Sequence, residues 1–119
     1  MLGKLRTVYT AIEAANELEK ENISCEVIDP RTLTPLDRET ISKSVLKTKR
    51  LIVADPGWHS FGAASEIISS VSEQNIHAMK ASPMRITLPD SHTPMSVPLE
   101  KKYYIKQNDI ISAIKKILK

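Results

Sequence analysis

Segments with helical periodicity alternate with short apolar segments along the chain, and this alternation restricts the fold more than any other feature. Apolar residues recur every three or four positions, as in amphipathic helices, over residues 6–21, 35–48, 63–73 and 108–119. Three short apolar segments lie between these stretches and are predicted to be buried strands: residues 23–28, 51–54 and 84–88. Strands joined by helices pair in parallel through right-handed crossovers. We therefore expect one α/β domain over residues 1–119, with three α/β/α layers and a mainly parallel sheet.

Local signals predict where several of these elements begin and end. Asn22 tolerates the left-handed conformation that ends a helix. Thr34 can cap a helix whose first residue is Pro35, and Asp37 is favoured near the positive end of the helix dipole. Three prolines in residues 89–103 predict an extended, non-helical passage after the last strand.

Composition excludes several classes of protein. The longest aliphatic run, residues 51–54, is far too short to span a bilayer, and no apolar N-terminal stretch resembles a secretory signal. A single cysteine, Cys25, excludes an intrachain disulfide and a cysteine-based zinc site. We therefore expect a reducing, cytoplasmic location and no membrane partner.

The excess of basic residues does not indicate a nucleic-acid partner. Seventeen Lys and Arg against fourteen Asp and Glu give a formal net charge of +3. The basic residues fall in short, surface-like groups instead of one helix face, whereas nucleic-acid binders concentrate them. The chain has one Trp, three Tyr and one Phe, too few for a base-stacking platform.

No catalytic, cofactor-binding or metal-binding residue is assigned from the pattern. His59, His77 and His92 match no metal-ligand spacing, and no phosphate-binding glycine loop or nucleophile elbow occurs. Asp55, His59 and Ser60 contain the side-chain types of a catalytic triad. However, near neighbours in one loop rarely reach triad geometry.

The loop that follows the second predicted strand is the strongest candidate site. It leaves the carboxyl end of a parallel strand and enters a helix, where ligands bind in open α/β sheets and where anions are favoured. Its large aromatic residues suit a subunit interface or internal packing better. We expect an interface and keep a small-anion or metabolite site as the alternative. The candidate residues are Asp55, Gly57, Trp58, His59, Phe61 and Gly62.

The stretch Glu26–Asp37, EVIDPRTLTPLD, resembles the signature of the transketolase C-terminal domain family. The strand-to-helix loop around residues 57–63, the Arg-Ile-Thr of residues 85–87 and the closing helix also match, so the resemblance covers nearly the whole chain. It is strongest to beta subunits of the thiamine-dependent decarboxylating component of 2-oxo-acid dehydrogenase complexes, of the pyruvate dehydrogenase type. The matched signature residues are Asp29, Arg31, Thr32, Pro35, Asp37 and Arg85.

The resemblance implies a C-terminal assembly and subunit-interface domain of such a dehydrogenase, or of a transketolase-like enzyme. In the family, thiamine diphosphate and Mg²⁺ are held by preceding domains through a Gly-Asp-Gly motif, which this sequence lacks. We therefore expect the chain alone to bind no cofactor and to contribute to the parent oxidoreductase or transferase reaction only within an oligomer. The expected partners are other subunits or domains of the parent enzyme, an acyltransferase core and further copies of the chain.

Two departures from the family pattern change these expectations. Lys80 stands about where some members carry an acidic docking residue, which disfavours docking to an acyltransferase core through that contact. Family domains also begin with a strand before the first helix, between the strands that match residues 23–28 and 51–54. Gly3 matches the end of that strand. The first strand is therefore expected to be missing, which leaves roughly 10 kcal/mol of apolar burial unmade. Either the sheet closes over the gap, or a strand is supplied in trans, or the chain is part of a longer enzyme, which is the interpretation we favour.

Overall fold

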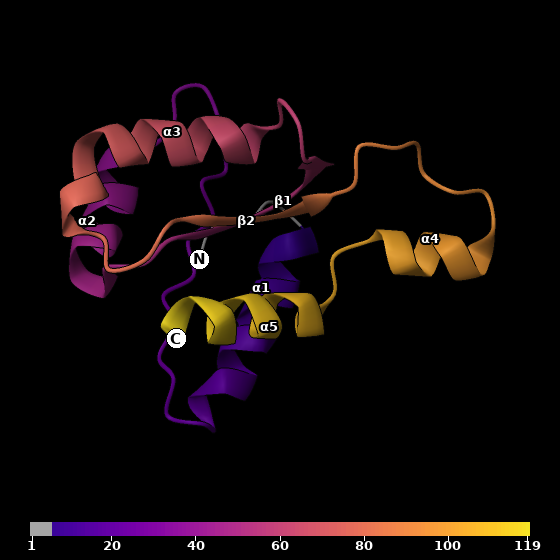
Figure 1. The fold of residues 1–119 in the computed structure, drawn as a ribbon, viewed down its shortest axis with the longest axis horizontal. Helices are drawn as coiled ribbons and strands as arrows, with labels where there is room; N and C mark the ends of the chain where they lie inside the picture. The colour runs from indigo at the N-terminus through magenta and orange to yellow at the C-terminus, as the bar shows by residue number, and fades with distance from the viewer. Residues whose placement is uncertain (1–5) are drawn as a thin grey trace.

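The computed structural model describes residues 6–119, which form a layered body and a projecting arm (Figure 1). The helices are α1 (Arg6–Glu19), α2 (Arg38–Thr48), α3 (Ala63–Asn75), α4 (Val97–Tyr103) and α5 (Gln107–Leu118). The strands are β1 (Ile52–Trp58) and β2 (Met84–Leu88), and a 3₁₀ turn, η1 (Ile76–Ala78), follows α3. None of the described helices is both long and apolar enough to cross a membrane.

The two strands of the described part are parallel and lie between two layers of helices. Ile52 is paired with Met84, and Ala54 with Ile86, before the register shifts so that Trp58 lies opposite Leu88. Helices α2 and α3 lie on one side of the sheet, and α1 and α5 on the other (Figure 1). The predicted α/β class and three-layer arrangement are therefore confirmed.

The alternation of side chains along β1 divides the interior into two cores. Val53 faces α2 and α3, where it packs with Ile41, Val45, Ala64, Ile67 and Val71. Ile52 faces α1 and α5, where it packs with Ala11, Ala14, Leu18, Ile110, Ala113, Ile114 and Ile117. Both helix layers thus depend on this one strand, whose residues from Ile52 to Asp55 are all buried.

The strand predicted at residues 23–28 is wrong, because this segment is extended but forms no strand in the structure. Only Ile28 is a bridge residue. A strand requires a neighbour that supplies backbone hydrogen bonds, and the described sheet contains only β1 and β2. The segment is instead placed by its side chains, since Ile23, Cys25 and Val27 pack against the core of α1 and α5. The expectation about a first strand ending at Gly3 lies outside the described residues.

The predicted start of the second helix is also wrong. Helix α2 begins at Arg38, and its N-cap is Asp37, not Thr34. The Asp37 carboxylate accepts hydrogen bonds from the Thr40 N–H at 3.1 Å and the Thr40 hydroxyl at 2.6 Å. At the end of α1 the prediction is confirmed, because Asn22 has a φ of 62° three residues after Glu19.

The prolines predict an entirely extended passage after β2, but the structure contains a helix in it. Residues 89–96 are non-helical, but α4 follows them, with Pro98 in its first turn, where a missing N–H breaks no helical bond. We call residues 89–106 the arm, because this segment reaches away from the layered body (Figure 1). The Tyr103 hydroxyl donates to the Ser91 carbonyl at 2.7 Å and so joins the two sides of the arm near its base.

Replacing Leu18 with alanine should strongly destabilise the body. The Leu18 side chain is fully buried between α1 and α5, so L18A should lower the free energy of unfolding by about 2–5 kcal/mol. The control L46A removes the same atoms from a leucine of α2 that is 49% exposed, and should cost less than about 1 kcal/mol. Urea unfolding followed by circular dichroism measures both values, and equal losses would contradict this packing.

Candidate functional site

The candidate loop lies at the carboxyl ends of β1 and β2, but it is shorter than expected. Strand β1 continues through Asp55 and Gly57 to Trp58, so only residues 59–62 connect it to α3. The strand continues because the register shift after Ala54 lets Trp58 pair with Leu88.

Asp55 is buried and joins the end of β1 to the start of α3. Its carboxylate accepts a hydrogen bond from the Gly57 N–H at 3.1 Å and another from the Ala64 N–H at 3.1 Å. A negative charge is favoured at this end of a helix, where backbone N–H groups have no intrahelical partner. Both carboxylate oxygens are therefore engaged within the fold, which gives Asp55 a structural role.

Two glycines lie around Asp55, and close approach of the backbone requires one of them, Gly62. A side chain at Gly62 would overlap the carbonyl oxygen of Trp58, and one at Gly57 would lie 3.1 Å from an Asp55 carboxylate oxygen. Their absent side chains let the chain turn tightly around Asp55.

Because the turn is tight, two aromatic side chains face outward. Phe61 is fully exposed and has a φ of 58°, a left-handed conformation that costs energy for a bulky residue. Trp58 is 50% exposed and contacts His92 edge-on, with 6.0 Å between the ring centroids. An exposed phenylalanine on a constrained loop is well placed to enter a partner's surface.

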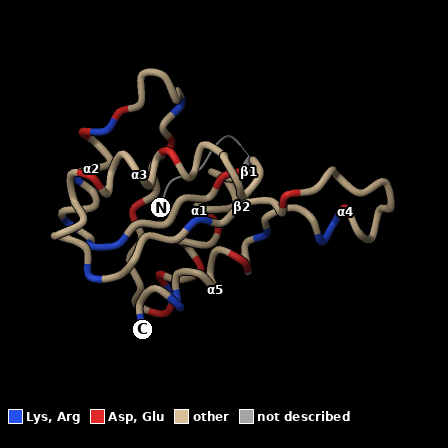
Figure 2. Tube along the Cα trace, turned by 45° about the horizontal axis from the view of Figure 1, so that its top comes forward, with Lys and Arg blue, Asp and Glu red and all other residues tan. Residues whose placement is uncertain are grey.

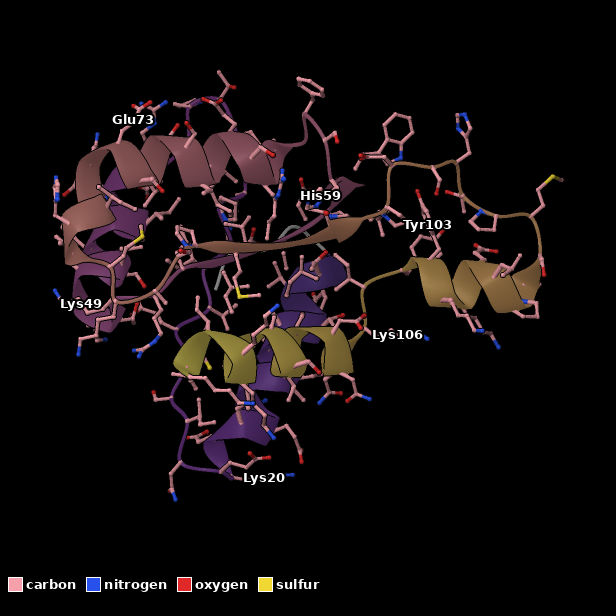
Figure 3. All side chains as sticks on the ribbon, in the orientation of Figure 1. Lys20, Lys49, His59, Glu73, Tyr103 and Lys106 are labelled. Atoms are coloured by element: carbon pink, nitrogen blue, oxygen red, sulfur yellow. The ribbon has the colours of Figure 1, made fainter. Side chains whose placement is uncertain are left out.

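A network of polar contacts ties the loop to β2. His59 Nδ1 lies 2.9 Å from the Thr87 hydroxyl, and the Arg85 guanidinium donates to the His59 carbonyl at 2.7 Å and to the Ser65 hydroxyl. Figure 3 shows His59 where the strands end, with Tyr103 at the nearer end of α4. Arg85 thus holds β2, the loop and the first turn of α3 together.

A second contact ties the loop to the start of the arm. Asp90 accepts a hydrogen bond from the Ser60 N–H at 2.8 Å and another from the Ser60 hydroxyl at 2.5 Å. These bonds hold the pKa of Asp90 below its ordinary value, the hydroxyl bond having the larger effect, and the nearby charges of His59 and Arg85 lower it further.

The remaining signature residues lie apart from this network. Asp29 accepts a hydrogen bond from the Arg31 N–H at 3.1 Å, the Thr32 hydroxyl donates to the Pro35 carbonyl at 2.9 Å, and Asp37 caps α2. These residues shape the turn before α2. Of the signature set, only Arg85, on β2, contacts the candidate loop.

A groove of about 380 Å³ beside the loop contains residues that the sequence analysis did not select. His59 and Arg85 line it together with Lys102, Tyr103 and Tyr104 of the arm. The run Lys101–Tyr104 is the sequence feature that could have indicated this groove. It lies in the passage predicted to be non-helical, and nothing in the sequence places that passage beside the loop. Over residues 6–119, basic and acidic residues are interspersed along the trace (Figure 2).

The described residues do not fit a metal centre. Within residues 6–119, no three His, Cys, Asp or Glu side chains come close enough together to hold a metal ion. The carboxylates of Asp55 and Asp90, which contact the loop and the residues beside it, are already hydrogen-bonded to Gly57, Ala64 and Ser60. A diphosphate anchored through Mg²⁺ therefore has no ligand set in this part of the chain.

The variant D90N should lower the melting temperature at pH 7, and this deficit should shrink in acid. Because the folded-state pKa of Asp90 is depressed, its carboxylate contributes fully above the ordinary value of 3.8, and the contribution is lost as the pH falls through the lower folded value. Melting temperatures of both proteins from pH 7 to pH 2 measure this. In the background S60A the effect of D90N should be smaller, because the main partner is gone. A deficit that stays constant over the whole range would contradict the contact.

Comparison with known proteins agrees with the fold described above. The model of the family "Transketolase, C-terminal domain" matches residues 5–110. The pyruvate dehydrogenase E1 component subunit beta of Rickettsia felis is 40% identical over 110 residues, which is 92% of this chain and 34% of that protein. The mitochondrial pyruvate dehydrogenase E1 component subunit beta of Homo sapiens is 40% identical over 114 residues, 95% of this chain and 32% of that protein.

A solved structure gives the same result for the fold. A split gene transketolase, described as an inactive beta4 tetramer, superposes with a TM-score of 0.78 at 28% identity, over 98% of this chain and 38% of that one. The chain thus spans about a third of the length of the curated relatives it matches. With a family model covering most of its residues and relatives at 40% identity, the chain belongs to the transketolase C-terminal domain family.

Proposed function

We propose that this chain is a non-catalytic assembly domain of a thiamine diphosphate-dependent enzyme, of the 2-oxo-acid dehydrogenase or transketolase type. Support comes from the family and from the pyruvate dehydrogenase E1 beta subunits that share 40% of its residues. In this proposal other domains or subunits of the parent enzyme bind thiamine diphosphate and Mg²⁺. The chain forms one domain and acts in the cytoplasm, as its single cysteine suggests.

The arm carries the observation that favours an assembly role. Met95 is fully exposed, and Val97 and Leu99 are 61% and 56% exposed, so three apolar side chains of one projecting segment face solvent. Single exposed apolar residues are ordinary, but several on one projecting element mark an interaction surface. Burying them against another subunit would recover the hydrophobic stabilisation that the isolated arm lacks.

The loop adds aromatic anchors to the same function. Phe61 is fully exposed and Trp58 half exposed, and aromatic residues of this kind dominate the energetics of interfaces. The Ser60–Asp90 bonds join this loop to the first residues of the arm. Loop and arm are therefore presented together, which reduces the entropy lost when a partner binds.

A small-anion module is the second candidate, favoured by the groove beside the loop. Arg85, Lys102 and His59 line this groove and can together attract an anion. Arg85, however, already donates to His59 and Ser65. Asp109 on the groove wall adds negative charge. The assembly role is therefore the stronger proposal, and an acyltransferase core stays among the proposed partners beside other subunits and further copies of the chain.

The assembly role predicts self-association through the arm and loop. Sedimentation velocity of the wild-type chain over a range of concentrations should show dimers or larger species. The variants L99D and F61D should each weaken association by at least about tenfold, or ~1.4 kcal/mol, because a charge must then be desolvated in the interface. The control L46D places the same charge on an exposed leucine of α2 and should associate normally. A wild-type chain that stays monomeric, and whose melting temperature rises with phosphate, would favour the anion module instead.

The chain alone should neither bind thiamine diphosphate nor consume a 2-oxo acid. The physical reason is the lack of a metal-ligand cluster among residues 6–119 and the engagement of the nearby carboxylates in the fold. Calorimetric titration with thiamine diphosphate and Mg²⁺ should give no heat of binding, and incubation with pyruvate should release no CO₂. Micromolar cofactor binding or CO₂ release by the purified chain would overturn the proposal.

A further inference from the structure

Two segments without acidic residues meet at the end of the body opposite the arm (Figure 1). Residues 40–54 and 74–89 contain no Asp or Glu, whereas elsewhere along the trace both charges are interspersed (Figure 2). The sequence shows their basic residues as separate short groups, and the fold brings these groups together. The basic residues of α2, of the turn after it and of the loop after η1 are Lys43, Lys47, Lys49, Arg50 and Lys80.

Hydrogen bonds at two points hold these segments against each other. The Asn75 amide donates to the Ser42 hydroxyl at 3.0 Å. Farther along both segments, the Lys80 N–H donates to the Lys49 carbonyl at 2.9 Å. Between these bonds, Met79 packs against the core beneath α2. The end of α2 and the residues from η1 onward therefore form one continuous surface.

Two aliphatic side chains lie among the charges of this surface, which we call the basic end and define as residues 43–50 and 76–80. Leu46 of α2 is 49% exposed, and Ile76 of η1 is 48% exposed. One exposed aliphatic side chain is ordinary, but these two lie among lysines, whose long side chains also present apolar stems. The basic end is therefore amphipathic, and an anion without apolar groups would leave its aliphatic part in water.

Two lysines of the basic end have no carboxylate to balance their charge. Lys43 and Lys47 each contact a glutamate, at 2.7 Å and 3.5 Å. Within residues 6–119, Lys49 and Lys80 form no ion pair. The dipole of α2 favours cations at the end of that helix, but it does not account for Lys80, which follows η1. This positive charge is therefore available to a partner.

We propose that the basic end docks an acidic segment of a partner polypeptide, in which leucine or isoleucine is interspersed with aspartate or glutamate. The carboxylates of this segment pair with Lys49 and Lys80, and its aliphatic side chains cover Leu46 and Ile76. Charge complementarity sets the orientation of the segment, and burial of the aliphatic groups adds affinity.

A nucleic acid fits this surface less well, because the basic end contains no Trp, Tyr or Phe on which bases could stack. The proposal goes beyond the assembly role, since none of these residues belongs to the loop or the arm. It also differs from the docking contact of relatives that carry an acid at this position, because Lys80 has the opposite charge.

Three peptides, each labelled with fluorescein at the N-terminus, test the chemistry of the partner by fluorescence anisotropy. The probe is Glu-Leu-Asp-Glu-Ile-Leu-Asp-Glu-Leu-Glu. One control peptide has serine at every leucine and isoleucine, and the other has asparagine and glutamine in place of the acids. Each control should bind at least about tenfold more weakly than the probe. Added salt should weaken binding of the probe, because it screens exposed charges.

A matched pair of variants tests the place of binding. The variant K49E/K80E reverses the two unpaired lysines and should bind the probe at least about tenfold more weakly. The control K101E/K102E changes the net charge by the same amount at two exposed lysines of the arm, and should bind the probe like the wild type. Circular dichroism and the melting temperature show whether both variants are folded.

Four results would overturn the proposal. They are no binding of the probe at about 1 mM protein, equally tight binding of the serine peptide, unchanged binding in K49E/K80E, and tighter binding of a single-stranded oligonucleotide through the same two lysines. K49E/K80E should self-associate like the wild type in sedimentation velocity. None of the four results bears on association through the arm, so the two proposals fail separately.

Discussion

The buried carboxylate of Asp55 is the interaction on which the rest of the loop depends. A charge this deeply buried is tolerated only when it is hydrogen-bonded, and here the Gly57 and Ala64 N–H groups supply the bonds. To bring both groups to one carboxylate, the chain must turn tightly, which Gly62 allows because it has no side chain to meet the Trp58 carbonyl. The outward position of Phe61 follows from that turn.

Hydrogen bonds and an aromatic contact join the loop and the arm into one surface, although the two segments are distant in sequence. Ser60 is hydrogen-bonded to Asp90 at the start of the arm, and Trp58 contacts His92 two residues later. Arg85 fixes the other side of the loop to β2. An interface built on such cross-links is largely ordered before a partner arrives, so less conformational entropy opposes association. Such order before binding suits the proposed assembly role.

The predictable part of the fold is the part that depends on local periodicity. α1 and α3 follow from apolar spacing, and β2 from a short apolar run, because each is determined by its own residues. The segment at residues 23–28 could not be assigned correctly in this way, since being a strand depends on a neighbour. The prolines predict no helix at α4. This prediction fails because Pro98 lies in the first helical turn, where a proline breaks no helical hydrogen bond. At the site, Asp90 and Lys102 reach the loop only through the tertiary fold, which spacing along the sequence does not encode.

The aspartates of this chain are used to hold the fold. The chain contains five, all within the described residues, and each accepts a hydrogen bond from a backbone N–H. The pairs are Asp29 with Arg31, Asp37 with Thr40, Asp55 with Gly57 and Ala64, Asp90 with Ser60, and Asp109 with Lys106. A carboxylate that holds a turn or a helix start has fewer acceptor positions left for other partners. The aspartates therefore stabilise a framework that presents the exposed apolar residues of the arm, which is the proposed interaction surface.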